Sequence, residues 1–122
     1  MALLGAPWVG RTIRSWPHRV AVEGRSMVPT LSPGDWLLVD PLAYRDRGPA
    51  VGDIVVAPDP REPARLLVKR VGRASADGSL ELHGDSPDAS TDSRAFGPLP
   101  ASAVTGRAWA RYWPLRRIGL LR

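Results

Sequence analysis

Thirteen prolines are spread along this chain of 122 residues, and they limit its fold more than any other feature. A proline lacks the backbone N–H that a helix interior needs, and its ring clashes with the preceding turn. No stretch of ten residues has the spacing of apolar side chains that an amphipathic helix requires. The sequence therefore predicts a mostly β fold with long loops.

Short runs of β-type residues, bounded by Gly, Pro or Asp, are typical of strands joined by tight turns. We expect strands at residues 19–23, 36–40, 54–57, 66–71, 80–83 and 104–112. Asp77-Gly78 marks the clearest hairpin, because Asp-Gly favours a two-residue turn between antiparallel strands. The loops at 40–52 and 86–100 are long for a small domain, and such loops are usually functional or disordered.

The composition excludes several classes of site. The chain has no cysteine, which rules out disulfides, thiolate metal sites and a cysteine nucleophile. Its two histidines, His18 and His83, lack the spacing of a metal site. We therefore expect no metal. The length allows a single small domain.

Basic charge is concentrated at the two ends of the chain. Residues 1–25 carry four arginines and one glutamate, and residues 107–122 carry five arginines. These ends also hold four tryptophans: Trp8, Trp16, Trp109 and Trp113. We favour a solvated basic rim with tryptophan packed beneath it, and contact with anionic lipid or nucleic acid is the alternative. A sequence pI near 10.9 describes the surface and does not by itself indicate a nucleic-acid partner.

No segment is long enough to span a membrane. The longest uncharged stretches, 1–10 and 95–106, fall well short of the ~20 apolar residues of a transmembrane helix. The first ten residues also lack the basic n-region of a signal peptide. The sequence therefore predicts a cytoplasmic protein without a transmembrane segment, with peripheral membrane contact as the alternative.

Lys69 is the single lysine among seventeen basic residues, and it lies in the apolar run 66–71. A buried ammonium can lose its proton near neutral pH, whereas a guanidinium stays charged. Lys69 is therefore a candidate general base, although a codon bias toward arginine would also leave one lysine by chance. Ser26 lies 43 positions upstream in a turn-like setting of Gly and Pro, and it could supply a nucleophile.

A Ser-Lys pair has a definite chemical requirement. The Ser26 hydroxyl is a weak nucleophile until a neighbour accepts its proton, and Lys69 can do so only as a neutral amine. The pKa of Lys69 must then fall, which apolar surroundings favour because they disfavour the ammonium form. Arg70, the next residue of the strand, should point to the opposite face.

Three blocks occur in order: Glu23 to Leu31 followed by Gly34-Asp35, then Val68 to Val71, then Gly84-Asp85-Ser86 running on to Arg94 and Gly97-Pro98. This set resembles the S26 signal peptidase family over about residues 20–112. The resemblance implies a compact β-rich serine endopeptidase with a Ser26-Lys69 dyad that needs no cofactor. We assign residues 19–122 to the catalytic domain and 1–18 to a basic, tryptophan-containing segment.

Within this family the chain looks most similar to the nickel-type superoxide dismutase maturation proteases, because it is short, lacks an anchor and ends in an Arg-Tyr-Trp-Pro-Leu-Arg-Arg tail. The implied activity is removal of an N-terminal leader from a precursor protein, here the superoxide dismutase. The alternative is type I signal peptidase-like processing of exported proteins.

The resemblance also implies supporting roles for other residues. Ser90 matches the position whose hydroxyl holds the lysine amine, and Asp92 with Arg94 matches an ion pair that braces the catalytic loop. Their simpler interpretations are a turn cap and a surface ion pair of little energetic value. The backbone N–H of Ser26 is a natural oxyanion donor. Gly24 stands where many signal peptidases carry a hydroxyl, so the second donor stays open.

Met27 and Pro29 are expected to shape the substrate groove and the turn after Ser26, with core packing of Met27 as an equal alternative. A triad built on His83 is disfavoured because Lys69 already fills the role of base. A self-cleaving repressor, which shares the Ser-Lys β fold, is disfavoured because the twenty-five residues before Ser26 are too few for its DNA-binding domain. A noncatalytic β module is disfavoured because it would not need the Ser26-Lys69 pair.

Overall fold

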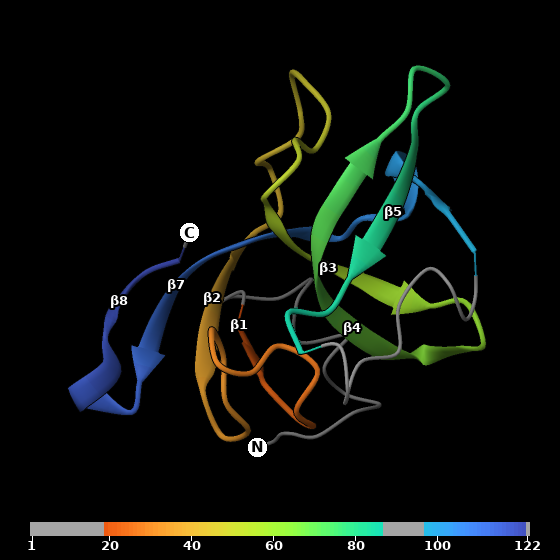
Figure 1. The fold of residues 1–122 in the computed structure, drawn as a ribbon. Coiled ribbons are helices and arrows are strands. Elements are labelled where there is room, and N and C mark those ends of the chain that lie inside the picture. Colours follow the sequence, from red (N-terminus) through yellow and green to blue (C-terminus); the bar gives the residue numbers. More distant parts are fainter. Residues whose placement is uncertain (1–18, 87–96, 122) are drawn as a thin grey trace.

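The computed structural model describes residues 19–86 and 97–121 (Figure 1). These residues form strands and short 3-10 helices, without an α-helix among them, which confirms the predicted mostly β fold. In chain order the elements are β1 (Arg19–Ala21), β2 (Trp36–Asp40), β3 (Ile54–Asp59), β4 (Glu62–Ala74), β5 (Ser79–His83), β6 (Leu99–Pro100), η1 (Ala101–Ala103), β7 (Gly106–Trp113), η2 (Leu115–Arg117) and β8 (Gly119–Leu120).

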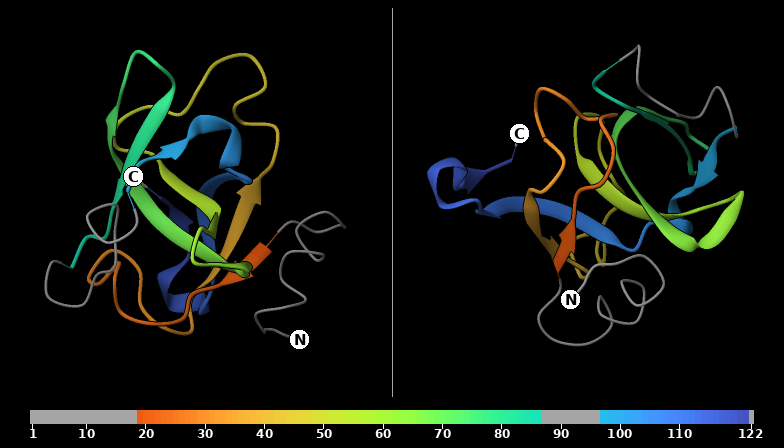
Figure 2. Two further views of the ribbon diagram at one scale, coloured as in Figure 1. Left: turned by 90° about the vertical axis from the view of Figure 1, so that its right-hand side faces the viewer. Right: turned by 90° about the horizontal axis from the view of Figure 1, so that it is seen from below.

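All strand pairs are antiparallel and belong to one continuous sheet. The strand order is β1-β2-β7-β3-β4-β5-β6, and β8 pairs with the outer part of β7. The sheet is strongly bent, with β1, β2, β7 and β8 on one side and β3, β4 and β5 on the other (Figures 1 and 2). Strand β7 joins the two sides because it pairs with β2 along most of its length and with β3 at Gly106 and Arg107.

The bend gives the molecule two apolar clusters. One contains Met27, Leu31, Leu37 and Val39, and the other contains Val71, Leu80, Leu82 and Leu99. Strand β3 serves both, because successive side chains of a strand point to opposite faces. Ile54 and Val56 pack in the first cluster, and Val55 and Ala57 pack in the second. This double burial explains why β3 reads as a continuous apolar run.

The strands lie where the sequence predicts them, with two differences. Strand β4 runs over thirteen residues, well beyond the apolar run 66–71, because its first part pairs with β3 and its last part with β5. The two-residue strands β6 and β8 were not expected, since segments so short carry no periodic pattern. The hairpin predicted at Asp77-Gly78 is present, but its loop covers residues 75–78 and is longer than a two-residue turn; Gly78 takes a positive φ of 88° in it.

The loop between β2 and β3 is fastened to its own end. The Tyr44 hydroxyl donates a hydrogen bond of 2.7 Å to the Asp53 carboxylate, which also accepts the Ala50 N–H at 3.1 Å. Burial and the bond to Asp53 raise the pKa of Tyr44 well above its usual range.

Within residues 19–86 and 97–121, no helix is long and apolar enough to cross a membrane.

Candidate active site

Ser26 lies in a series of bends and turns over residues 24–31, called the Ser26 turn below, within the loop of residues 22–35 that joins β1 to β2. The Val28 N–H donates to the Arg25 carbonyl at 3.2 Å, and the Leu31 N–H donates to the Met27 carbonyl at 2.8 Å. Gly24 has a φ of +74°, a conformation that residues with a side chain rarely adopt. This backbone requirement gives a physical reason for glycine at the position where many signal peptidases carry a hydroxyl.

The two residues expected to shape a substrate groove occupy different environments. Met27 is buried in the first apolar cluster, whereas Pro29 is exposed on the surface of the turn. The Met27 side chain therefore anchors the turn to the core, as its simpler interpretation holds. A direct contact of either residue with substrate stays a prediction.

Lys69 is buried in the middle of β4, with an exposed fraction of 3%. It pairs with Val55 of β3, and its neighbours Leu67 and Val71, which share its face of the strand, are also buried. The adjacent Arg70 is turned to the other face, as alternation along a strand requires. Burial of the single lysine agrees with the environment that a neutral amine needs.

The segment after β5 ties the Ser26 turn to β4. Arg70 binds Asp85 through two guanidinium nitrogens, with Nε at 2.9 Å from Oδ1 and Nη2 at 2.8 Å from Oδ2. The Thr30 hydroxyl donates to Asp85 Oδ2 at 2.5 Å. The next residue, Ser86, donates its N–H to the Ser26 carbonyl at 2.9 Å. The turn and the strand that carry the two candidate catalytic residues are therefore joined through Asp85 and Ser86.

The hydrogen-bond donors around Asp85 favour its charged form. The bidentate hydrogen bonds from Arg70, opposed by partial burial and aided by the Thr30 hydroxyl, hold the pKa of Asp85 below its usual value. The same bonds raise the pKa of Arg70. Both groups therefore stay charged at neutral pH, and the bond persists where the enzyme would work.

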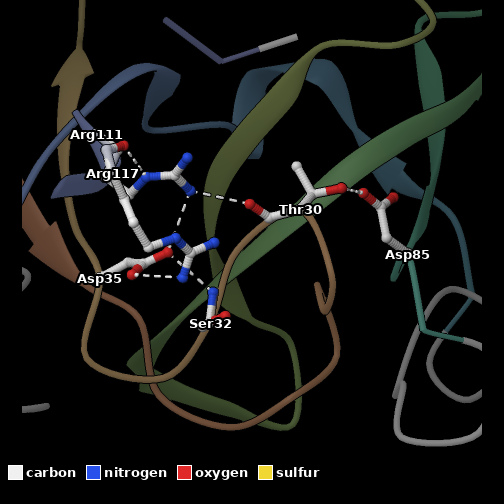
Figure 3. Close-up of polar contacts among 6 residues, drawn as sticks. All are labelled: Thr30, Ser32, Asp35, Asp85, Arg111 and Arg117. Carbon is white, nitrogen blue, oxygen red and sulfur yellow. Dashed lines mark hydrogen bonds and ion pairs between the residues drawn. The ribbon is translucent and has the colours of Figure 1, made fainter. Parts of the chain in front are cut away.

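A second ion cluster holds the other side of the same turn, and sequence reasoning missed it (Figure 3). Asp35 is buried, and its carboxylate accepts hydrogen bonds from the Ser32 N–H at 2.9 Å, from Arg111 at 3.2 Å and from Arg117 at 3.3 Å. The Gly34-Asp35 pair gave only a turn signal, and the terminal arginines gave only a basic rim. A buried pairing between segments so far apart leaves no local pattern.

Three expected site residues, Ser90, Asp92 and Arg94, lie outside the described residues. His83 lies on β5 with its ring over Gly72, where an added Cβ would meet the His83 Nδ1 at 2.4 Å. Its Nε2 lies 3.8 Å from the Glu81 carboxylate. Among residues 19–86 and 97–121, no group of three His, Cys, Asp or Glu side chains is arranged to hold a metal ion.

Comparison with known proteins decides the family. The family described as signal peptidase, peptidase S26, matches residues 3–77 and 73–113, which is most of the chain. The chain belongs to the S26 signal peptidase family. Membership in S26 supports a peptidase that processes precursors in the manner of signal peptidases.

Several S26 relatives are mitochondrial proteins. The mitochondrial ATP-independent inner membrane protease subunit 1a of Arabidopsis thaliana is 38% identical over 123 aligned residues, 83% of this chain and 73% of the relative. The mitochondrial inner membrane protease subunit 1 of Homo sapiens is 33% identical over 122 aligned residues, 84% of this chain and 74% of the relative. Subunit 2 of Danio rerio is 33% identical over 117 aligned residues, 79% of this chain and 64% of the relative.

These relatives correct one expectation and leave another without support. The expected cytoplasmic location is wrong, because the relatives are named as proteases of an inner membrane. That expectation rested on the lack of a spanning segment, and a protein can belong to a membrane without one. The nickel superoxide dismutase maturation proteases are not the group to which these relatives belong, so a dismutase substrate is not supported.

Proposed function

We propose that this protein is a serine endopeptidase that removes an N-terminal leader from a precursor protein with a Ser26-Lys69 dyad. The observation that carries the proposal is the attachment of the Ser26 turn to β4 at the residue after Lys69. Arg70 binds Asp85 at 2.8 Å, and Ser86 binds the Ser26 carbonyl at 2.9 Å. Family membership supports the peptidase chemistry, and the burial of Lys69 supports its role as base.

In the proposed reaction, the Ser26 Oγ attacks the scissile carbonyl while the neutral Lys69 amine accepts the hydroxyl proton. The oxyanion that forms accepts a hydrogen bond from the backbone N–H of Ser26. Lys69 then gives its proton to the leaving amine, which releases the mature protein and leaves the leader as an acyl ester on Ser26. Water, deprotonated by the same amine, hydrolyses the ester and restores Ser26.

The remaining site assignments belong to this proposal. Ser90 would hold the Lys69 amine, and Asp92 with Arg94 would brace the loop that carries Ser90. Pro29 would lie beside the bound leader, since it is exposed on the Ser26 turn, and Met27 would support that surface from the core. These residues would all belong to a catalytic domain of residues 19–122.

We also place the protein at the surface of a membrane, as the names of its relatives suggest. The end of the sheet at β7, η2 and β8 exposes large apolar side chains, namely Trp109, Trp113, Leu115, Ile118 and Leu120. Arg116 of η2, which is exposed, lies among them. Exposed tryptophan and aliphatic side chains with adjacent arginine suit the interface of an anionic bilayer. Flotation with vesicles of phosphatidylglycerol and of phosphatidylcholine tests this, and equal recovery with both contradicts the arginine contribution.

A panel of leader peptides tests the proposed activity. It should contain leaders of inner-membrane and exported precursors and of a nickel superoxide dismutase precursor, with cleavage read by mass spectrometry as a new N-terminus. The full-length chain should cleave at one bond in members of one leader class, and Ser26→Ala should cleave none. Equal cleavage by the Ser26→Ala protein would overturn the proposal.

A further inference from the structure

We propose that Arg111 and Arg117 are positioning residues for the Ser26 turn, which they hold through Asp35 and the Thr30 carbonyl. The inference rests on the proposed function, because it assigns these arginines to the placement of the candidate nucleophile. They belong to the C-terminal hairpin of β7, η2 and β8, which otherwise contributes no residue to the candidate site. Their contacts cross from one end of the sheet to the loop that carries Ser26 (Figure 3).

Arg111 binds three acceptors with one guanidinium group. Its Nε donates to the Arg117 carbonyl at 2.6 Å, and its Nη1 lies 2.9 Å from the Thr30 carbonyl and 3.2 Å from Asp35 Oδ2. A planar guanidinium fixes the directions of its donors, which a flexible lysine ammonium does not. Arg111 therefore sets the distance between the hairpin and the end of the Ser26 turn.

Asp35, the residue before β2, accepts hydrogen bonds from both arginines. The carboxylate is 2% exposed, and Arg117 Nη1 contacts Oδ1 at 3.3 Å. The backbone of Asp35 makes two further hydrogen bonds within this loop. Its carbonyl accepts the Val22 N–H at 2.8 Å, and its N–H donates to the Ser32 carbonyl at 3.0 Å. A buried carboxylate without its cationic partners is costly, so the arginines hold this corner in one arrangement.

The opposite side of the turn is held by Asp85 and Ser86. Thr30 belongs to both sets of contacts, since its carbonyl accepts from Arg111 while its hydroxyl donates to Asp85. Ser26 lies inside a segment that is therefore fixed from the hairpin on one side and from β4 on the other. A displacement of the reacting atoms by about 1 Å can slow a reaction about a hundredfold, so loosening one side should affect catalysis.

The test compares these ion pairs with a matched pair elsewhere. Arg111→Lys and the milder Arg117→Gln change the proposed positioning residues. Asp59→Asn is the control, because Asp59 is equally buried, at 1% exposed, and pairs with Arg61 in the β3-β4 hairpin at 3.0 Å. All are made in the full chain and assayed on the leader peptide that the wild type cleaves, well below each variant's Tm.

We expect kcat to fall about tenfold or more in Arg111→Lys and several-fold in Arg117→Gln, with KM changed less than about twofold. Asp59→Asn should lower Tm but leave kcat within about twofold of the wild type. Hydrogen exchange gives a readout that is independent of activity. The Leu31 amide, bonded to the Met27 carbonyl at 2.8 Å, should exchange faster in the two arginine variants and not in Asp59→Asn.

The proposal is overturned if both arginine variants keep wild-type kcat while folded, or if kcat falls equally in Asp59→Asn. It is also overturned if Leu31 exchange is unchanged in both arginine variants. Failure of the proposed function would look different. Ser26→Ala would then retain cleavage, while the exchange rates would still report whether the hairpin holds the turn.

Discussion

Arg70 binds Asp85 through two nitrogens, at 2.9 and 2.8 Å, directly beside the buried Lys69. Two adjacent basic residues of one strand thus have opposite environments. One is a partly buried guanidinium that keeps its charge in a bidentate pair, and the other is a buried amine suited to losing its charge. The proposed dyad needs this division, and the chain has one lysine beside sixteen arginines.

The first prediction concerns Lys69. Lys69→Met and Lys69→Arg should each lower kcat by about a thousandfold or more, because neither side chain can accept the Ser26 proton. Cleavage of the leader peptide measures the effect, and circular dichroism checks the fold. Near wild-type cleavage by Lys69→Arg would contradict the assignment of the base.

With the intact dyad, activity should rise with pH as the neutral amine becomes populated.

Asp85 should make stability depend on pH in the acid range. Its folded pKa is lowered, so its contribution is complete above the unfolded value of ~3.9 and is lost as pH falls through the folded value. The difference in unfolding free energy between the wild type and Asp85→Asn should therefore be large at neutral pH and shrink below about pH 4. Urea denaturation at several pH values measures this. A difference that does not change with pH would contradict it.

The Thr30 hydroxyl offers a matched pair of substitutions. Thr30→Val removes the donor to Asp85 while keeping the shape of the side chain, and should lower the unfolding free energy by about 1–2 kcal/mol. Thr30→Ser keeps the hydroxyl and should cost less. Urea denaturation of both variants separates the hydrogen bond from the lost methyl group. Equal costs would mean that the bond to Asp85 contributes little.

The loop between β2 and β3 gives a test at alkaline pH. Because the folded pKa of Tyr44 is raised, the bond to Asp53 should stabilise the fold at neutral pH and be lost as pH rises above the ordinary value of ~10. Tyr44→Phe should lower the unfolding free energy by about 1 kcal/mol. It should also remove a phenolate absorbance that appears only at higher pH. A Tyr44 that ionises at the ordinary pH would contradict the buried bond.

Much of the fold could be predicted from local signals. The strands β2 and β3 follow from apolar runs that a Gly-Asp pair precedes, and β5 from a run that a Gly-Asp pair ends, while Asp77-Gly78 placed the hairpin between β4 and β5. The single lysine in an apolar run also predicted the burial of Lys69. These features depend on neighbouring residues, so a sequence displays them directly.

Long-range ion pairs could not be predicted in this way. Asp35 and Arg111 lie 76 positions apart, and nothing in either segment selects that partner over another charged residue. The location was also misjudged, because the lack of a spanning segment does not exclude a protein from a membrane. The expectation of tryptophan packed beneath a basic rim was wrong for Trp109 and Trp113 of β7, because both are exposed.

Strand β7 lies between β2 and β3, although β2 and β3 both precede it by more than forty residues. Until residues 106–113 enter the sheet, the facing edges of these two strands lack the partner that β7 provides, and the first apolar cluster, which includes Ala108 of β7, is incomplete. During synthesis, we therefore expect the Ser26 turn to be held from the β4 side alone until β7, which carries Arg111, emerges from the ribosome. A peptidase built in this order would stay inactive as a nascent chain, when its own unfolded segments are most exposed to cleavage.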